Sequence, residues 1–126
     1  MEERIRPIVL ASASPRRRAI LDLAGIPFTV LAPDVEEAAD AALGAAALVR
    51  ENARRKARAA YARCGDPAAT VLAADTLVVS PEGDILGKPR DACDATRMLR
   101  ALSGRWHAVL TGAAVLHAGE ERLLCE

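Results

Sequence analysis

A single acidic residue, Asp75, interrupts the most apolar segment of the chain, ATVLAADTLVVS at residues 69–80. The length of this segment and the turn formers around it predict a strand in the interior of a sheet. Because side chains alternate between the two faces of a strand, Asp75 shares a face with Val71 and Ala73. An ionised carboxylate there is costly unless a cation, a metal ion or hydrogen-bond donors accompany it. The segment alone leaves two roles open for Asp75, a structural ion pair or a functional acid.

The composition limits the class of protein and its partners. The chain has 126 residues, 52% of them hydrophobic, and a formal net charge of zero, which fits one domain without a general polyanion-binding surface. Three aromatic residues offer little to stack on bases, and no apolar run is long enough to cross a membrane. Because the N-terminus also lacks a signal-peptide pattern, we expect a cytoplasmic protein that binds neither nucleic acid nor membrane. The three cysteines lack metal-site spacing, so we expect reduced and mostly buried thiols.

Short apolar runs alternate with helical patterns along the chain, which predicts an α/β fold. Strands are expected at residues 5–11, 26–32, 69–80 and 106–118, with another strand opening at 122, and helices at 15–24, 41–64 and 92–103. Ser14 and Asp91 are the expected N-caps of the first and third helices. The apolar stripe of the long helix includes Leu43 and leaves Lys56 on its flank, where the ammonium could reach a cleft or solvent. The stripe of the third helix includes Leu99.

The start of the first helix, SASPRRR at residues 12–18, is a candidate anion site. Three consecutive arginines place positive charge at the positive end of the helix dipole, which is electrostatically unfavourable. A bound anion would offset this repulsion. The hydroxyls of Ser12 and Ser14, the guanidinium groups of Arg16 and Arg17, and the free amides of the first turn could converge on it. The alternative is a solvated basic helix face.

Lysine is the rarer base in this chain, since 15 of the 17 basic residues are arginine and only Lys56 and Lys88 are lysine. Each lysine is a candidate for a position that requires a compact ammonium, although chance explains the pair equally well. Lys88 lies in the sequence GKP, a short rigid segment that suits presentation of an ammonium to a phosphate.

Three acidic residues could hold a divalent cation, namely Glu36, Glu37 and Asp75, because carboxylate oxygens suit Mg²⁺ and Mn²⁺. A surface pair is the more usual role for two adjacent glutamates. His107 and His117 lack zinc spacing and are expected to be structural. Neither glycine-rich phosphate loop, GxxxxGK(S/T) or GxGxxG, occurs in the chain. A small phosphorylated ligand is therefore the partner that fits these residues best.

These motifs occur in an order that resembles the Maf family of nucleoside triphosphate pyrophosphatases. The matching segments are LASASPRRRAILDLAGIPF, ENARRKARA, VLAADTLVV and ILGKPRDACDATRMLRALSGRWHAVLTG. The resemblance implies a Maf/ITPase-like fold, an elongated mixed β-sheet flanked by helices with a cleft between two lobes. It further implies that residues 1–126 form a single Maf-like domain. Family members continue through a C-terminal segment with a lysine and a glutamine, so the second lobe is expected to be incomplete here.

The resemblance also implies an activity and the residues that carry it. The family hydrolyses a nucleoside triphosphate between the α and β phosphates with a divalent metal cation, Mg²⁺ or Mn²⁺. By position in the motifs, Asp75 matches the catalytic acid that activates water, Glu37 matches an acid near the metal, and the phosphate-facing positions are Ser12, Arg16, Arg17, Lys56 and Lys88. Arg16 and Thr76 resemble the branch that acts on dTTP and UTP rather than on 7-methyl-GTP.

The resemblance extends to partners and biological role, and it leaves alternatives open. It implies a homodimer, a task in sanitation of the nucleotide pool and a link to septum formation. One alternative is a non-catalytic nucleotide-binding or regulatory fragment that acts through partner contacts. Another is an incomplete gene product that does not fold stably alone.

Overall fold

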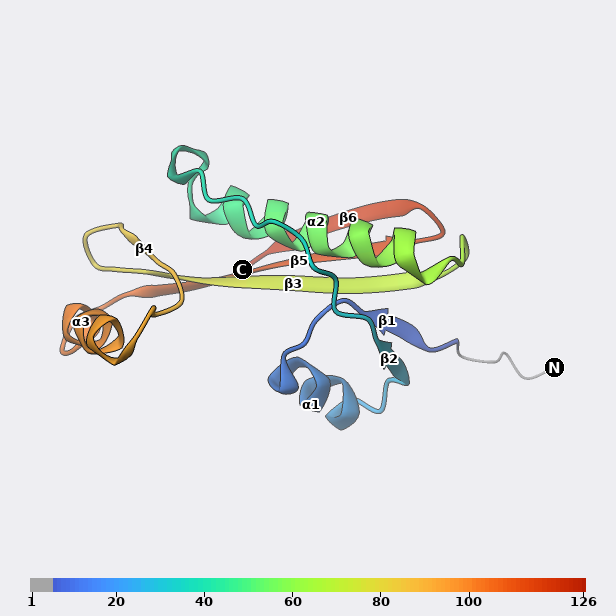
Figure 1. Cartoon of the computed structure of the whole chain (residues 1–126), viewed down its shortest axis with the longest axis horizontal. Helices are drawn as coiled ribbons and strands as arrows, with labels where there is room; N and C mark the ends of the chain where they lie inside the picture. Colours follow the sequence, from blue (N-terminus) through green and yellow to red (C-terminus); the bar gives the residue numbers. More distant parts are fainter. Residues whose placement is uncertain (1–5) are drawn as a thin grey trace.

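The computed structural model describes residues 6–126, and within this range the chain forms a six-stranded sheet with three α-helices (Figure 1). The strands are β1 (Ile8–Leu10), β2 (Phe28–Val30), β3 (Thr70–Val79), β4 (Ile85–Leu86), β5 (Ala108–His117) and β6 (Glu120–Cys125). The helices are α1 (Pro15–Leu23), α2 (Ala45–Cys64) and α3 (Ala92–Leu102). The predicted α/β class is therefore confirmed. The first strand was expected to begin at Ile5, which lies outside the described residues.

The sheet is mixed, and its strands follow the order β2-β1-β3-β5-β6. β1 runs parallel to both β2 and β3, whereas β5 is antiparallel to β3 along its whole length, from the Thr70–His117 pair to the Val79–Ala108 pair. In this ladder Asp75 lies opposite Gly112. The long β3–β5 ribbon is the axis along which the other elements are arranged (Figure 1).

One edge of β3 is left without a strand partner at its centre. β1 pairs with β3 at Val71 and Leu72, and β4 pairs with it at Val78 and Val79. Within the described chain, residues 73–77 have β5 as their only strand neighbour. We call residues 73–77 the open edge of β3. It separates β1, β2 and α1 from β4 and α3, which is the two-lobed arrangement that the resemblance implies (Figure 1).

The core lies between α2 and the β3–β5 ribbon. Alternating side chains of β3 and β5 meet the small residues of α2, and the resulting cluster includes Ala53, Ala57, Ala60, Val71, Ala73, Ala114 and Leu116. Helix α1 lies on the opposite side of the sheet (Figure 1). Helix α2 approaches β5 so closely that a Cβ atom on Gly112 would lie 2.4 Å from the carbonyl carbon of Val49. Glycine at this position therefore sets the distance between α2 and the sheet.

Both N-caps follow the prediction, but the start of the long helix does not. The Ser14 hydroxyl accepts from the amide of Arg17, and the Asp91 carboxylate accepts from the amide of Asp94. Helix α2 begins at Ala45, not at residue 41, because Gly44 adopts a positive φ of 81° after a separate 3₁₀ turn at Ala41–Leu43. Leu43 is consequently half exposed and does not belong to the buried stripe.

Three further expectations are corrected, two by the burial pattern and one by the start of a strand. The apolar stripe of α3 is not covered within the described chain, since no residue of α3 is buried and Leu99 is 68% exposed. The thiols are free as expected, but none is buried, and Cys93 is exposed. Strand β6 already begins at Glu120, two residues before the predicted start, because the turn is only two residues long.

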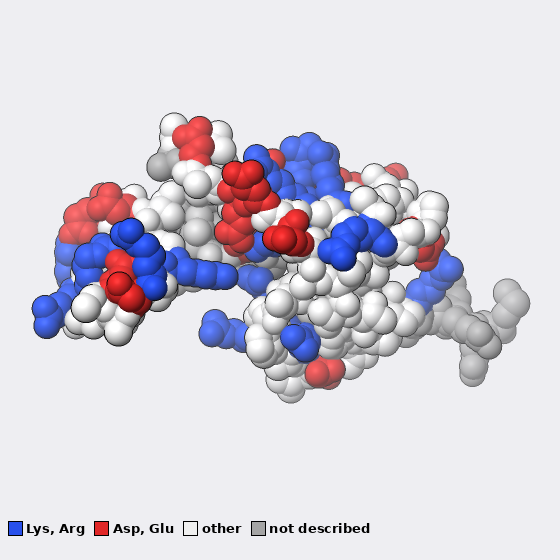
Figure 2. All heavy atoms as spheres, in the orientation of Figure 1, with Lys and Arg blue, Asp and Glu red and all other residues white. Residues whose placement is uncertain are grey.

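The surface carries both signs of charge. Figure 2 shows acidic and basic side chains interspersed over one face, with basic side chains gathered around α3. This distribution agrees with the formal net charge of zero. Among the helices of residues 6–126, none combines the length and hydropathy that a bilayer span requires.

Candidate functional site

The Asp75 carboxylate is buried and held by two donors from one helix. The residue is 7% exposed, on the face of β3 that α2 covers. Lys56 Nζ lies 3.3 Å from Asp75 Oδ1, and Asn52 Nδ2 donates to Asp75 Oδ2 at 3.1 Å. Asn52 and Lys56 are four residues apart, so they lie on the same side of α2. The carboxylate thus has the cation and the amide donor that its burial demands.

Lys56 also contacts a second carboxylate. Its ammonium lies 3.1 Å from Glu37 Oε1, and its side chain is only 18% exposed. Glu37 belongs to residues 31–40, a segment without helix or strand that passes over α2. The flank position of Lys56 therefore does place its head group in a site, between two acids. Glu36, the other candidate acid, is exposed, and its carbonyl oxygen accepts from Arg55 at 3.2 Å.

Arg17 joins the start of α1 to the open edge of β3. Its Nη1 donates to Ser12 Oγ at 3.3 Å and its Nη2 donates to Thr76 Oγ1 at 3.3 Å. The Thr76 hydroxyl is in turn 3.0 Å from the Thr111 hydroxyl across the ladder. The guanidinium group is therefore held between Ser12, in the connection from β1 to α1, and Thr76 of β3. Thr111 of β5 contacts only the Thr76 hydroxyl.

The Ser12 hydroxyl accepts two hydrogen bonds through its oxygen, which leaves its hydrogen as a donor. Its oxygen accepts from the Ser14 amide at 3.1 Å and from Arg17, and these two contacts use its lone pairs. Within residues 6–126 no acceptor uses the hydroxyl hydrogen, so it can donate to an anion. Together with the Arg17 guanidinium it forms a set of donors suited to phosphate oxygens. The amides of the first turn add little, because Pro15 has no N–H and the amides of Arg17 and Arg18 donate to Ser14.

The two halves of the site meet at the open edge. Asp75 and Thr76 are neighbours in β3 and point to opposite faces of the sheet, so the acid lies on the α2 side and the hydroxyl on the α1 side. A ligand at the unpaired edge between them can reach both faces. The arrangement combines a buried carboxylate with an ammonium and an oriented guanidinium, and such cations can stabilise charge on a phosphoryl group.

Two predicted residues are not drawn into this arrangement. Arg16 and Lys88 are both exposed, and neither side chain makes a hydrogen bond or ion pair within residues 6–126. Continuing the β3–β4 register from the Val78–Leu86 pair sets Lys88 opposite Thr76, but β4 ends at Leu86. Lys88 therefore follows the open edge in sequence without contacting it.

Sequence reasoning missed three residues of the site: Asn52, Thr111 and Gly112. Asn52 carries the same signal as Asp75, a polar residue on an apolar face, one helical turn before Lys56. Gly112 in the interior of a predicted strand marks a close backbone approach. Thr111 had no signal of its own, because its partner is fixed only by the register between β3 and β5.

The donor set allows a divalent cation only together with a ligand. Within the described chain, no three His, Cys, Asp or Glu side chains group as a metal cluster would. Glu37 and Asp75 nevertheless converge on one ammonium, at 3.1 and 3.3 Å. Mg²⁺ is often held by one or two carboxylates plus substrate phosphates and water. The two acids fit such a cation when a triphosphate supplies the other oxygens.

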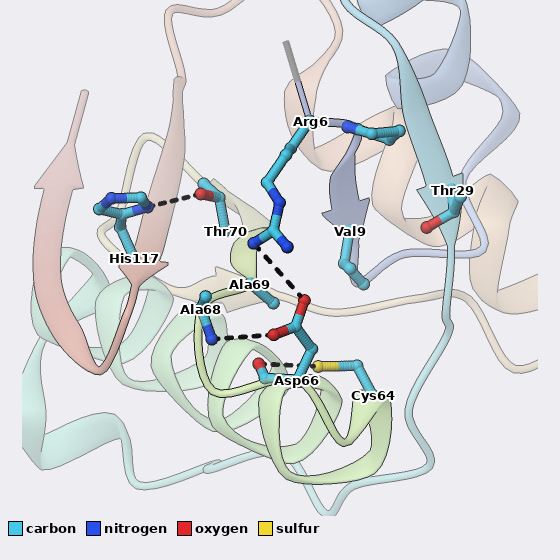
Figure 3. Close-up of a pocket in the computed structure, with 10 residues that line it drawn as sticks. Arg6, Val9, Thr29, Cys64, Asp66, Ala68, Ala69, Thr70 and His117 are labelled. Atoms are coloured by element: carbon cyan, nitrogen blue, oxygen red, sulfur yellow. Dashed lines mark hydrogen bonds and ion pairs between the residues drawn. The ribbon is translucent and has the colours of Figure 1, made fainter. Parts of the chain in front are cut away.

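A separate cavity of about 570 Å³ lies at the other end of β1 and β3 (Figure 3). Arg6 and Asp66 pair across it at 3.9 Å, and Thr70 Oγ1 lies 2.6 Å from Nδ1 of His117. None of the predicted site residues lines it. His117 thus bonds within the fold, as expected of a structural residue. His107 lies just before β5 rather than on it.

Comparison with known proteins identifies close relatives. The family described as Maf-like protein matches residues 7–125. Proteins named dTTP/UTP pyrophosphatase from Symbiobacterium thermophilum, Moorella thermoacetica and Myxococcus xanthus are 50%, 51% and 50% identical over 93%, 88% and 93% of this chain. The matched part is 59%, 56% and 58% of their lengths, so the chain spans less than three fifths of each of these curated relatives.

Two solved structures share the fold at low identity. The Staphylococcus aureus Ham1 protein matches with a TM-score of 0.66 and 16% identity over 95% of this chain and 68% of that chain. A nucleoside-triphosphatase / dITP/XTP pyrophosphatase from Mycobacterium abscessus matches with a TM-score of 0.59 and 20% identity over 96% and 71%. The family match over residues 7–125 and the identities near 50% agree with this fold, and the chain belongs to the Maf family.

Proposed function

We propose that this chain carries the catalytic groups of a dTTP/UTP pyrophosphatase, which hydrolyses the bond between the α and β phosphates to give the monophosphate and pyrophosphate. The observation that carries the proposal is the buried Asp75 carboxylate beside Lys56, at an open strand edge that Arg17 and Ser12 face from the other side. Relatives that are 50% and 51% identical are named dTTP/UTP pyrophosphatase, which supports the same reaction.

Each residue has a chemical task in this reaction. Ser12 and Arg17 bind phosphate oxygens, and Lys56 offsets charge that develops on the transferred group. Asp75 orients the attacking water and accepts its proton, since each carboxylate oxygen keeps a lone pair beyond the one bond from Lys56 or Asn52. Lys88 contacts the phosphates when the ligand is bound. Its exposure and lack of partners leave it free to do so.

Glu37 and Asp75 are the residues that would hold Mg²⁺ or Mn²⁺ with the triphosphate. When bound, the cation supplies positive charge to the phosphate oxygens and lowers the pKa of the attacking water. Both acids contact the Lys56 ammonium, whose single positive charge offsets one of their two negative charges.

Selectivity for dTTP and UTP is assigned to Arg16 and Thr76. Thr76 supports this best, because its hydroxyl is held between Arg17 and Thr111 at the open edge. The intact set of acid, ammonium and guanidinium favours catalysis over a purely regulatory role. A cytoplasmic location, homodimerisation and nucleotide-pool sanitation are further proposals that follow from the family.

The test measures pyrophosphate release from dTTP and UTP with Mg²⁺ for the whole chain and for Asp75→Asn. The variant keeps the size of the side chain but removes its negative charge, so turnover should fall by about 10²–10⁴-fold. Asp66→Asn is the matched control, because Asp66 is exposed and lines the separate cavity. Turnover of Asp75→Asn within about threefold of wild type would contradict the assigned base.

A further inference from the structure

Asn52 is a polar residue on the buried face of α2, and all the hydrogen-bonding atoms of its amide are used. The residue is 2% exposed. Its Nδ2 donates to Asp75 Oδ2 at 3.1 Å and to the Ala38 carbonyl oxygen at 3.2 Å. Its Oδ1 accepts from the Ala38 amide at 2.6 Å. Two N–H hydrogens and one carbonyl oxygen thus meet two acceptors and one donor.

This pattern permits only one orientation of the amide. If the group were rotated by half a turn, its oxygen would face the Asp75 carboxylate and the Ala38 carbonyl oxygen. The NH₂ group would then face the Ala38 amide hydrogen. Every contact would become repulsive, so the position of Asp75 and the position of the Ala38 backbone are fixed relative to each other.

Ala38 directly follows Glu37, so the contact between Asn52 and Ala38 also affects the position of a proposed site residue. Residues 31–40 contain no helix or strand that would fix Glu37. The side chain of Glu37 is 51% exposed and its partner Lys56 is long and flexible. A further polar contact of this segment with α2, from Arg55 to the Glu36 carbonyl oxygen, is exposed. Asn52 is the short, buried anchor among these contacts.

We propose that Asn52 is a positioning residue that holds Asp75 and the segment carrying Glu37 in one relative geometry, and this inference rests on the function proposed above. Its amide pairs with both backbone groups of Ala38, as a neighbouring strand would. The two carboxylates thereby face the same point, where Lys56 now lies. Asn52 itself does not touch the substrate.

The chemistry of the amide explains why other residues do not replace it. Aspartate has the same shape but places a negative charge beside Asp75 and the Ala38 carbonyl oxygen. Glutamine is one methylene longer and shifts the amide along the helix. Alanine leaves the Asp75 oxygen and both Ala38 backbone groups without their partner.

The experiment compares Asn52→Ala and Ala38→Pro with wild type, using the whole chain. Ala38→Pro removes the amide hydrogen that Asn52 accepts without changing α2. Each variant is first shown by circular dichroism to be folded at the assay temperature. We expect kcat for dTTP to fall about 100-fold in both variants, while KM changes by less than about threefold, because Ser12 and Arg17 are unaltered.

A second readout does not depend on turnover. Hydrogen exchange at the Ala38 amide, followed by NMR, should accelerate at least about tenfold in Asn52→Ala, because the bond to Oδ1 is lost. Asp75→Asn should keep this protection, since the Asn52–Ala38 pair remains. Arg55→Ala is the matched control. It removes the exposed contact to Glu36 and should preserve both kcat and the Ala38 protection.

The inference is overturned by wild-type exchange at Ala38 in Asn52→Ala, or by wild-type kcat in that variant once folded. Ala38→Pro with full activity would do the same. A wild-type chain that releases no pyrophosphate contradicts the proposed function instead. The exchange experiment then decides the role of Asn52, because retained protection overturns it and lost protection supports it.

Discussion

The Asp75 carboxylate shows how one residue can be both buried and charged. Its two oxygens receive different partners, an ammonium from Lys56 and an amide hydrogen from Asn52. Removing a partner from a buried ion pair leaves an uncompensated charge, which commonly costs about 3–5 kcal/mol. Lys56 is 18% exposed, so solvent screens part of this interaction. We therefore expect the Lys56–Asp75 ion pair to contribute more to the positions of these two side chains than to the free energy of unfolding.

Glu51, one residue before Asn52, supplies a pH-dependent contribution to stability. Hydrogen bonds from Arg55 and Arg54, opposed in part by desolvation, hold the pKa of Glu51 below its usual value of 4.5. Because the folded-state pKa is the lower one, this contribution is present above about pH 4.5 and is lost as the pH falls below it. Glu51→Gln should lower stability at pH 7 by less than about 1 kcal/mol.

The measurement is thermal unfolding of wild type and Glu51→Gln from pH 7 to pH 3. The difference between their midpoints should shrink as the pH falls and should disappear at the acid end. Glu120→Gln, at an exposed position of β6, is the control for loss of one surface carboxylate, and its unfolding midpoint at pH 7 should equal that of wild type. A difference that stays constant across the range would contradict the assigned cause.

At the residue scale, the sequence predicted the burial of Asp75 and the flank position of Lys56, because strand and helix periods fix which face a side chain takes. It left open whether the Lys56 ammonium reaches a cleft or solvent. It did not predict the partners. Asn52 contacts Ala38 across 14 positions of chain, and only the packed fold brings them together. The exposed side chains of Arg16 and Lys88 have no packing that fixes them, so their roles stay predictions.

At the scale of elements, the close contact between α2 and β5 determines how near Asn52 lies to Asp75. A Cβ on Gly112 would lie 2.5 Å from the Val49 carbonyl oxygen and 2.7 Å from the Arg50 amide nitrogen. These are backbone atoms, so no side-chain rotation can relieve the overlap. Gly112 pairs with Asp75, and the close approach at this point lets the short Asn52 side chain reach the carboxylate.

Gly112→Ala should therefore move α2 away from the sheet. We expect a loss of about 1–3 kcal/mol or more in urea unfolding, as for other overpacked positions. Gly87→Ala is the matched control, because nothing lies within 4 Å of a Cβ there. The control should be close to neutral. Equal stability of the two variants would show that the helix has room to spare at Gly112.

Predicted elements agree in kind with the observed ones and differ at their ends. Helix α2 starts late because Gly44 takes a positive φ, which a helical pattern of small apolar residues does not reveal. The apolar stripe of α3 is present in the sequence but uncovered, with Leu99 68% exposed. A periodic pattern shows which residues share one face of a helix, but it does not show which element packs against that face.

For the molecule as a whole, the two sides of the open edge differ in how they are packed. The buried cluster lies where α2 covers β3 and β5, toward the β1 side of the open edge, whereas α3 contributes no buried residue within the described chain. The curated relatives are longer than this chain, which spans 59% of the first of them. That residues 1–126 form a single Maf-like domain stays a prediction.

Nucleotide binding should join the two sides, and Lys88 is the residue that tests this. Lys88→Ala should leave the unliganded unfolding temperature unchanged, because the side chain is exposed and unpaired within residues 6–126. It should reduce the rise in that temperature caused by Mg²⁺ and a dTTP analogue with an imido group between the α and β phosphates. Ligand at 100 times its Kd stabilises the wild type by about 2.7 kcal/mol.

Arg63→Ala, another exposed basic position, is the control at the far end of α2. It should show the full ligand-induced rise. If Lys88→Ala also shows the full rise, Lys88 does not contact the phosphates.

The open edge has a mechanical consequence. At the Leu77–Leu110 pair the described sheet is only two strands wide, since β4 first pairs at Val78 and β6 reaches only as far as Gly112. Two-stranded ribbons twist more freely than wide sheets. The twist of the ribbon at this point therefore sets how the Arg17 side is oriented relative to the Lys88 side. Under the proposed function, it also affects the distance that a bound triphosphate would span.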